Sequence, residues 1–201
     1  MTKSIDTQRE SQLTKAITLI DEINKQDPNS VVINGASIQV ELVYGQRMTN
    51  VLENFIPDAP LSLSIACRAQ HIKRWAILRA DYPMGRTGYL TWRKDLGAMH
   101  ADLAMDVAKK VGCDEDEVAA VGQMLRKEQL KREPLVQALE DVACLVFLTY
   151  YLTPFCEKYT PEKIISIVQK TWKKMSEAGH EAALKLPFTP AQTQLLTKAL
   201  S

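Results

Sequence analysis

The sequence predicts an all-α protein built as a single compact multi-helix domain. Apolar residues recur at spacings of three and four along most of the chain, as expected for helices that bury one face. Helix start and stop signals separate these segments, whereas the alternation of apolar and polar residues that is typical of strands is scarce. The 201 residues, 46% of them apolar and 24% charged, are enough to bury one sizeable core.

The N-terminal part is predicted to contain two helices joined by a non-helical segment. The first helix spans residues 7–25, and the turn-forming stretch "QDPNS" ends it. The stretch "VVINGAS" looks extended or looped, and helical spacing resumes near Gln39 until "IPDAP". We treat residues 1–26 as an N-terminal helix that packs on a domain formed by residues 27–201.

The middle of the chain predicts two helices around a loop. Proline suits the first turn of a helix, so Pro60 is expected to open a helix that continues to Leu78. Residues 79–89, "RADYPMGRTGY", hold one proline and two glycines without a clear period, which predicts a loop. Helical spacing returns over residues 90–111, and Gly112 is a typical residue to follow a helix.

The last part of the chain carries clear helix starts. Asp114 followed by Glu117 resembles a capping box, which predicts a helix through Leu130. Pro134 and Pro161 are each expected at the first turn of a further helix. Two short helical pieces are predicted after "AGH" and "FTP".

Composition and charge exclude several classes of protein. The formal net charge is +1, so no global field draws the chain to nucleic acid or membrane, although a local basic groove is compatible with it. The four cysteines are widely spaced without a CxxC pair, which favours reduced thiols in a cytoplasmic protein. No apolar run approaches the roughly 20 residues of a membrane span. We therefore expect a cytoplasmic protein without a membrane partner.

Asp141 raises the first question of function. Within "LEDVACLVFL" it shares a helix face with Leu145 and Leu148, and an unpaired inward charge is costly. A cationic partner is therefore expected: Arg, Lys, protonated His or a metal ion. Since His71 and His100 also lean inward, we expect His71, His100 and Asp141 to converge on a divalent metal ion. The alternative for each histidine is a core residue bonded to a carbonyl or carboxylate.

The segment from Arg68 to Lys94 is the most basic and most aromatic of the chain. Guanidinium groups bind phosphate and carboxylate in a bidentate manner, and aromatic rings stack on bases. The candidate substrate-binding residues are Arg68, Arg74, Arg79, Arg86, Arg93, Trp75, Tyr82 and Trp92. We expect at least two of Arg74, Arg79, Arg86 and Arg93 to line one pocket with His71. The alternative is a helix with solvated charges and a tryptophan in the core.

Two further residues are candidates for a catalytic role. Lys127 lies in the charged stretch "LRKEQLKRE", where it either turns inward as a partner of Asp141 or belongs to a solvated face. Glu140 precedes Asp141 on the same predicted helix. Beside a metal ion, Glu140 or Lys127 would support proton transfer or orientation.

Five stretches of the chain resemble one family. "ELVYGQRM", "RAQHIKRW", "YPMGRTGYLTWR", "LEDVACLVFL" and "KTWKKM", in this order, are similar to the domain of unknown function family DUF4202. The resemblance covers residues 27–186, and these motifs are long and specific. The family has no assigned activity, so this resemblance implies a family and no function.

A more distant resemblance implies a fold and a metal. "HADLAMDVAKKVGCDEDEVAAVGQML", followed by "LEDVACLVFL", is similar to the later helices of HD-domain metal-dependent phosphohydrolases. The resemblance implies an HD-like helical bundle in which His71 matches the early histidine ligand and Asp141 the late aspartate. His100 would fill the place of the doublet histidine or of an additional one. Ala101 follows it, so the aspartate of the doublet is missing.

Two functions from different classes follow. The leading one is an HD-like metalloprotein that hydrolyses a phosphorylated or nucleotide-like substrate, with a divalent ion that lowers the pKa of a bound water. The alternative is a degenerate HD-like module that binds an anionic small molecule or RNA without catalysis. A structural or partner-binding helical protein is the third.

Overall fold

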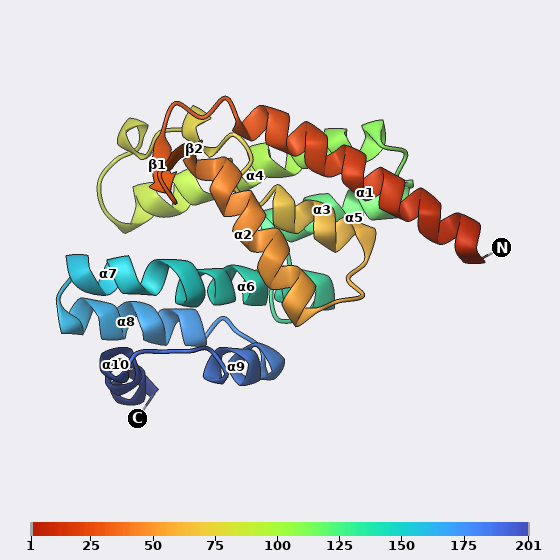
Figure 1. Cartoon of the computed structure of the whole chain (residues 1–201). Helices are drawn as coiled ribbons and strands as arrows, with labels where there is room; N and C mark the ends of the chain where they lie inside the picture. Colours follow the sequence, from red (N-terminus) through yellow and green to blue (C-terminus); the bar gives the residue numbers. More distant parts are fainter. Residues whose placement is uncertain (1, 201) are drawn as a thin grey trace. The chain divides into compact units, whose positions relative to one another are not determined.

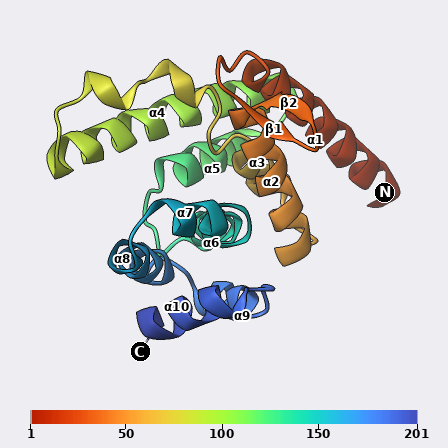
Figure 2. The ribbon, with the colours of Figure 1, turned by 60° about the vertical axis from the view of Figure 1, so that its left-hand side comes forward.

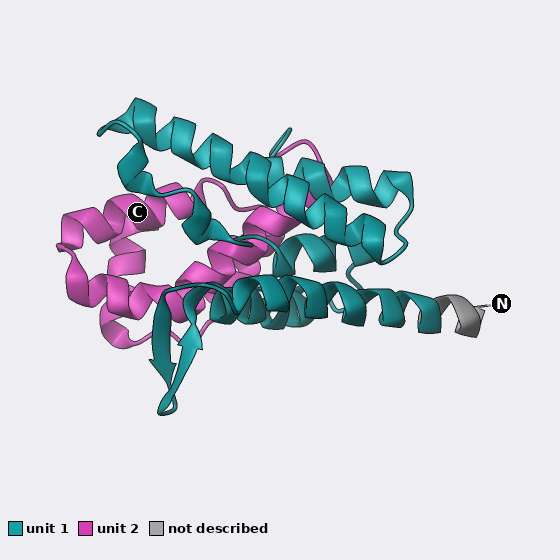
Figure 3. Ribbon diagram, turned by 90° about the horizontal axis from the view of Figure 1, so that it is seen from above, with its two compact units in different colours: residues 1–130 teal, residues 131–201 magenta. Residues whose placement is uncertain are grey.

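The computed structural model describes residues 2–200, and side chains from residue 7 onward, and it confirms the all-α class (Figure 1). Within these residues the only strands form one short hairpin. The chain divides into two compact units, Met1–Leu130 and Lys131–Ser201, coloured separately in Figure 3. The two units are described in turn.

Unit 1 contains the N-terminal helix, the hairpin and four further helices. In Figure 2 α4 and α5 lie side by side; α5 packs against both α4 and α3, and α1 packs against α3. The elements are α1 (Thr2–Asn24), β1 (Ser30–Ile33), β2 (Ala36–Gln39), α2 (Val40–Phe55), α3 (Leu61–Arg68), η1 (Arg74–Ala76), η2 (Arg79–Asp81), α4 (Arg86–Lys110) and α5 (Glu115–Arg126).

The stretch "VVINGAS" forms the hairpin. Strands β1 and β2 pair antiparallel, with Val31 opposite Ile38. Asn34 and Gly35 connect them with φ of 51° and 81°, the conformation that a two-residue hairpin turn requires and that Asn-Gly adopts readily. The segment was predicted to be extended or looped, and the Asn-Gly pair is the signal that identifies it as a hairpin.

The core of unit 1 joins all five of its helices. Side chains with less than 2% of their surface exposed come from α1, α2, α3, the turn after α3, and α5: Ile20, Met48, Leu63, Ile65, Ile72, Val121 and Met124. From α4, Ala101, Ala104 and Ala108 are fully buried. Burying a large aliphatic side chain stabilises a fold by about 1.5–3 kcal/mol, so this shared core fixes the helices that carry the cleft described below.

The helix predicted over residues 60–78 ends ten residues early, at Arg68. The chain then turns through residues 69–73, where Lys73 has φ 54° and its backbone N–H donates to Oδ1 of Asn24 at 3.0 Å. The same Asn24 donates from Nδ2 to the backbone carbonyl of Glu41 at 3.4 Å. Because Ile72 is fully buried inside this turn, the apolar spacing continued past the real end of the helix.

Helix α4 begins at Arg86, four residues before its predicted start. Gly85 precedes it with φ 92°, and Gly88 lies so close to the preceding loop that a Cβ there would be 1.9 Å from the carbonyl oxygen of Pro83. Only glycine permits this approach of loop and helix. The residues between η2 and α4 therefore form a tight loop, as predicted, but a shorter one.

Helix α5 confirms its predicted start and ends earlier than expected. Asp114 accepts from the backbone of Glu117 at 2.8 Å, and Glu117 accepts from the backbone of Asp114 at 3.1 Å, so both halves of the capping box are present. The helix ends at Arg126 because Lys127 adopts φ 57° and Gln129 also has a positive φ. This end places Lys127 beside α4.

Every regular element in the described part of unit 2 is helical, and short connections join them. Pro134 and Pro161 stand in the first turn of α6 and α8, as predicted. The elements are α6 (Pro134–Val146), the π-helical turn η3 (Phe147–Tyr151), α7 (Leu152–Lys158), α8 (Pro161–Trp172), α9 (Glu177–Leu184) and α10 (Pro190–Leu200).

The segments α6, η3 and α7 form one continuous helix, Pro134–Lys158. Pro154 has no N–H to donate to the carbonyl of Tyr150, and we attribute the wide turn just before it to this missing bond. By length and composition this helix is able to cross a membrane, contrary to the prediction that no run reaches that length. Of its most apolar window 56% is buried inside the protein, and core helices of soluble proteins have the same composition.

Candidate anion-binding cleft in unit 1

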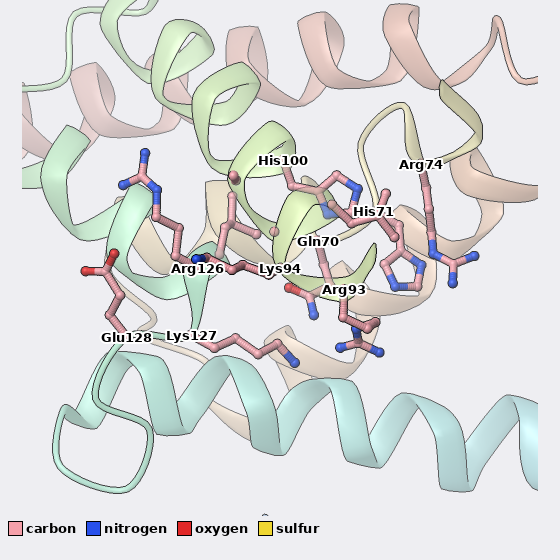
Figure 4. A pocket seen from close by; sticks show the side chains of 13 residues that line it. Gln70, His71, Arg74, Arg93, Lys94, His100, Arg126, Lys127 and Glu128 are labelled. Atoms are coloured by element: carbon pink, nitrogen blue, oxygen red, sulfur yellow. The ribbon is translucent and has the colours of Figure 1, made fainter. Parts of the chain in front are cut away.

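A cleft of about 400 Å³ opens in unit 1 between the turn after α3, helix α4 and the end of α5 (Figure 4). Its principal polar lining residues are His71, Arg74, Arg93, Lys94, His100 and Lys127. His71 and Arg74 follow the early end of α3, and Arg93, Lys94 and His100 belong to α4. Lys127 is the left-handed residue that ends α5. Three segments separated in sequence thus bring imidazole and cationic groups together.

The cleft is strongly cationic. Arg74, Arg93, Lys94, Arg126 and Lys127 line it, against one acidic lining residue, Glu128. Arg126 is paired with the exposed carboxylate of Asp102 at 3.0 Å. The side chains of Arg93 and Lys94 form no ion pair or hydrogen bond within the described part of the chain. Like charges held close together repel one another, so a cleft of this kind attracts an anion.

His71 is held in place by two residues of α2. Its Nδ1 lies 3.2 Å from Oε2 of Glu41, and its ring stacks on that of Tyr44 with centroids 3.9 Å apart and planes at 12°. A quarter of the side chain is exposed, on the side that lines the cleft. In Figure 4 it lies between Arg74 and Arg93.

His100 is a buried residue of α4, as its place on an apolar helix face predicted. Only 5% of it is exposed, and its ring centroid is 6.1 Å from that of His71. The ring bonds to the backbone of Gln70, while Nε2 is buried without a hydrogen-bond partner among the described residues. A buried polar atom without a partner is rare in proteins and marks a position where a ligand, water or proton completes the site.

Both imidazoles of the cleft are neutral at pH 7. Burial is the first cause that lowers the pKa of His71 well below its usual value, and the charges of Arg74, Arg93 and Lys127 lower it further. The pKa of His100 falls to about 3, again through burial first and then through His71 and the two arginines. The cleft therefore presents fixed positive charge and two uncharged histidines.

Glu41 is the site residue that sequence reasoning missed. It is 7% exposed, and burial raises its pKa to about 7, despite the opposing charge of Arg74, whose Nη1 lies 3.9 Å from Oε1. Its Oε2 lies near His71 but forms no aligned hydrogen bond. The signal was present, because Glu41 stands directly before the apolar residues Leu42 and Val43, as Glu140 and Asp141 stand before theirs.

Two of the four arginines expected beside His71 line the cleft, namely Arg74 and Arg93. Arg79 instead donates to the carbonyls of Tyr82 and Pro83 at 2.9 and 3.0 Å, so it organises the loop before α4. Arg86 is exposed at the first residue of α4 and is not among the lining residues.

Arg68 has a structural place that sequence reasoning did not foresee. It is 7% exposed and binds both carboxylate oxygens of Asp21, at 2.8 and 2.6 Å, and the hydroxyl of Thr49 at 3.2 Å. Each of the three guanidinium nitrogens of Arg68 thus donates a hydrogen bond inside unit 1. Arg68 is not among the residues that line the cleft, and its role in substrate binding stays a prediction.

The aromatic candidates also have structural places. Trp92 is 8% exposed, donates from Nε1 to the carbonyl of Ile77 at 3.0 Å and lies under the guanidinium of Arg74, 5.1 Å from the ring. The hydroxyl of Tyr82 donates to Asp95 at 2.8 Å. Neither these two nor Trp75 lines the cleft, so their rings are not arranged to stack on a ligand there.

Asp141 lies on α6 and receives neutral donors. Its Oδ1 accepts from the backbone of Ser176 at 2.8 Å and from Gln137 at 3.0 Å, and its Oδ2 accepts from the hydroxyl of Ser176 at 2.6 Å. Ser176 in turn caps α9 through Gly179, at 3.1 Å. The expectation of a cationic partner is therefore wrong, because donors at a helix N-terminus satisfy a buried carboxylate equally well.

The two candidate catalytic residues lie in different units. Lys127 lines the cleft of unit 1. Glu140 belongs to α6 of unit 2, where its side chain is 4% exposed and its Oε1 lies 3.3 Å from Nζ of Lys174. Their catalytic roles stay predictions.

Comparison with known families settles what kind of chain this is. The model of the domain of unknown function family DUF4202 matches residues 14–196. The chain belongs to the DUF4202 family. No match to it is found among curated proteins or among solved structures. The resemblance of this DUF4202 chain to HD-domain phosphohydrolases stays a prediction.

The resemblance implied a metal ion held by His71, His100 and Asp141. Among the side chains that the structure describes, no group of three or more His, Cys, Asp or Glu is placed to hold a metal ion. His71 and His100 belong to unit 1 and Asp141 to unit 2, so this set of ligands stays a prediction. The carboxylate of Asp141 is committed to Ser176 and Gln137. We derive no step through a metal, and a divalent ion stays a prediction.

The lowered pKa of His100 makes the stability of this DUF4202 chain sensitive to acid. As the pH falls from 6.5 toward 3, the unfolded chain binds a proton at His100 that the folded chain does not. The free energy of unfolding then falls by up to about 1.4 kcal/mol per pH unit from this group. We expect urea unfolding between pH 6.5 and pH 4.5 to show this loss in the wild type and a smaller one in His100→Gln.

Glu41 acts in the opposite sense, because its raised pKa makes folding more favourable as the pH falls from 7 toward 4.5. It is present in both proteins, so it cancels in the comparison. Equal slopes for wild type and His100→Gln would show that His100 is not held neutral by its surroundings.

Proposed function

We propose that the cleft of unit 1 binds a small anionic ligand of the phosphate type. The observation that carries this proposal is the meeting of Arg74, Arg93 and Lys127 around His71, close enough that their charges lower its pKa. Five basic residues line the cleft against one acidic lining residue, Glu128, so the lining carries an excess of positive charge. A bound anion balances this excess.

The dimensions and donors support this class of ligand. A volume of about 400 Å³ lies within the range of small-molecule sites. Guanidinium groups such as those of Arg74 and Arg93 match two phosphate oxygens at once, and an ammonium group such as that of Lys94 adds a point charge. A phosphorylated small molecule makes use of all of these groups.

A small ligand is favoured over RNA by the aromatic residues. Single-stranded RNA is held by exposed rings on which bases stack. In unit 1 the ring of Trp92 is buried and that of Tyr82 is tied to Asp95, and neither lines the cleft. The charges of the cleft are therefore better suited to a phosphate group than to a chain of bases.

Two matched arginine variants test the proposal. Arg93→Gln removes a cleft charge, whereas Arg86→Gln removes an exposed charge seven residues earlier on the same helix. We expect the wild type to bind inorganic phosphate at a single site in isothermal titration calorimetry at low ionic strength. Arg93→Gln should bind about tenfold more weakly or worse, since a charge-assisted hydrogen bond contributes about 1.5–3 kcal/mol.

The control decides whether the cleft or the overall charge binds the anion. Arg86→Gln should keep the wild-type affinity within about twofold, because a distant exposed charge is screened. Equal weakening in the two variants would point to non-specific attraction. No saturable binding of phosphate by the wild type would remove the proposal.

A further inference from the structure

The two nitrogens of His71 have different surroundings. Nδ1 faces Oε2 of Glu41 at 3.2 Å. Nε2, on the opposite side of the ring, makes no hydrogen bond within the described residues. It is not fully buried, since a quarter of the side chain is exposed. Because His71 lines the cleft, a ligand bound there meets an imidazole that has a carboxyl group behind it.

The ring is also fixed in orientation. The stacking of Tyr44 on one face, with centroids 3.9 Å apart, restricts rotation of the imidazole. His100, 6.1 Å away between centroids, limits the space beyond it. A carboxyl group behind one nitrogen and an open cleft before the other is the arrangement in which an imidazole carries a proton to a bound anion.

We propose that the cleft selects a doubly charged phosphate-type group and that His71 binds this group as an imidazolium, with the carboxylate of Glu41 behind it. This inference rests on the proposed anion-binding function and adds the charge of the ligand and the residue that responds to it. Glu41 is a positioning residue here, since it acts through His71.

The proton balance closes within the pair. When Glu41 holds a proton, the base nearest to Oε2 is Nδ1 of His71, and in this proposal the neutral ring carries its hydrogen on Nε2. Transfer across 3.2 Å leaves a carboxylate and an imidazolium, and the number of protons does not change. When Glu41 is already ionised, the proton comes from solvent. In both cases Nε2–H donates to the anion.

The charge of the ligand decides whether this transfer is favourable. In the cleft without a ligand, the charges around His71 oppose its protonation. A monoanion offsets one of these cations and leaves the others, whereas a dianion offsets two and places a second negative charge near Nε2. The groups that face His71 or act on it are Glu41 and Tyr44 on α2, Arg74 on η1, Arg93 and His100 on α4, and Lys127 after α5.

Imidazole ¹⁵N NMR tests the proposal, with sulfate as the probe, because sulfate is a dianion that does not titrate near neutral pH. The chain has three histidines, so the signals of His71, His100 and His180 are assigned with His71→Phe and His100→Gln. At pH 7.5 we expect His71 to be neutral without sulfate and to show both nitrogens protonated at saturating sulfate. The His180 signal, from unit 2, should not move and serves as the reference.

Methyl sulfate, a monoanion of similar shape, is the matched ligand control. We expect it to bind at least about tenfold more weakly than sulfate and to leave His71 mostly neutral. In Glu41→Gln, which keeps the shape of the side chain but neither accepts nor supplies the proton, sulfate should no longer charge His71. Unchanged His100 and His180 signals in that variant show that it is folded.

Each outcome decides one statement. Sulfate bound with His71 still neutral overturns the imidazolium and leaves the proposed function intact. Methyl sulfate that binds and charges His71 as well as sulfate does overturns the selection of a dianion. If neither sulfate nor phosphate binds, the proposed function is lost and this inference with it. These three outcomes are measured on the wild-type protein, and the variants His71→Phe and His100→Gln serve only to assign its signals.

Discussion

Arg68→Met is expected to lower the free energy of unfolding by about 3 kcal/mol or more. The substitution keeps much of the length of the side chain but removes the guanidinium that holds both oxygens of Asp21, at 2.8 and 2.6 Å. Asp21 is then left with 19% of its side chain exposed and without its cation. Breaking one half of a buried pair costs about 3–5 kcal/mol, and the partial exposure of Asp21 places the effect at the lower end.

Urea unfolding followed by circular dichroism measures this effect. Arg86→Met is the control, since Arg86 is exposed and its loss should cost at most about 0.5 kcal/mol. The double variant Arg68→Met, Asp21→Leu removes both charges and should recover part of the loss. A loss below about 1 kcal/mol for Arg68→Met alone would show that Asp21 is satisfied by water and that Arg68 is not a structural residue.

Asp141→Ala is expected to cost a similar amount, about 3 kcal/mol, through a different cause. It removes the acceptor of three hydrogen bonds, two from Ser176 and one from Gln137, and leaves their donors partly buried. A buried donor without an acceptor costs about 1–3 kcal/mol. The same change loosens the N-cap of α9, because Asp141 positions the Ser176 hydroxyl that accepts from Gly179.

The measurement is the same unfolding experiment with and without EDTA. Asp102→Ala is the matched control, because this aspartate forms only an exposed pair with Arg126, worth at most about 1 kcal/mol. EDTA should change neither the wild type nor Asp141→Ala. If EDTA lowered wild-type stability by as much as the substitution does, Asp141 would be a metal ligand after all.

Much of the helical architecture could be predicted from local signals. The capping box at Asp114 and the prolines that open α6 and α8 act within a single turn of helix, so the sequence carries them openly. The end of α3 was missed because the buried Ile72 continues the apolar spacing into the turn that follows. In that turn Lys73 takes the left-handed conformation without being glycine, and Lys127 does the same at the end of α5. At Lys73 a contact with Asn24, 49 residues earlier, holds this conformation, and local patterns do not carry such a contact.

The candidate site divides in the same way. The basic and histidine-containing segments indicated His71, His100, Arg74 and Arg93 because their residue types are themselves informative. For Asp141 the sequence was less informative: an inward carboxylate was expected to need a cation, but backbone, hydroxyl and amide donors satisfy it in the structure. Its partner Ser176 lies 35 residues away, so only the folded unit shows that the two meet.

The last turn of α1 contributes polar contacts to the core of unit 1, through Asp21 and Asn24. A truncation that starts at residue 27 would remove both Asp21 and Asn24. The first balances Arg68 within the core, and the second joins the backbone of Glu41 to that of Lys73, next to the turn that carries His71. No residue of α1 lines the cleft, yet a shortened chain would lose the hydrogen bonds that fix the turn after α3 and the start of α2. The helix is thus an integral part of unit 1 and not a detachable extension.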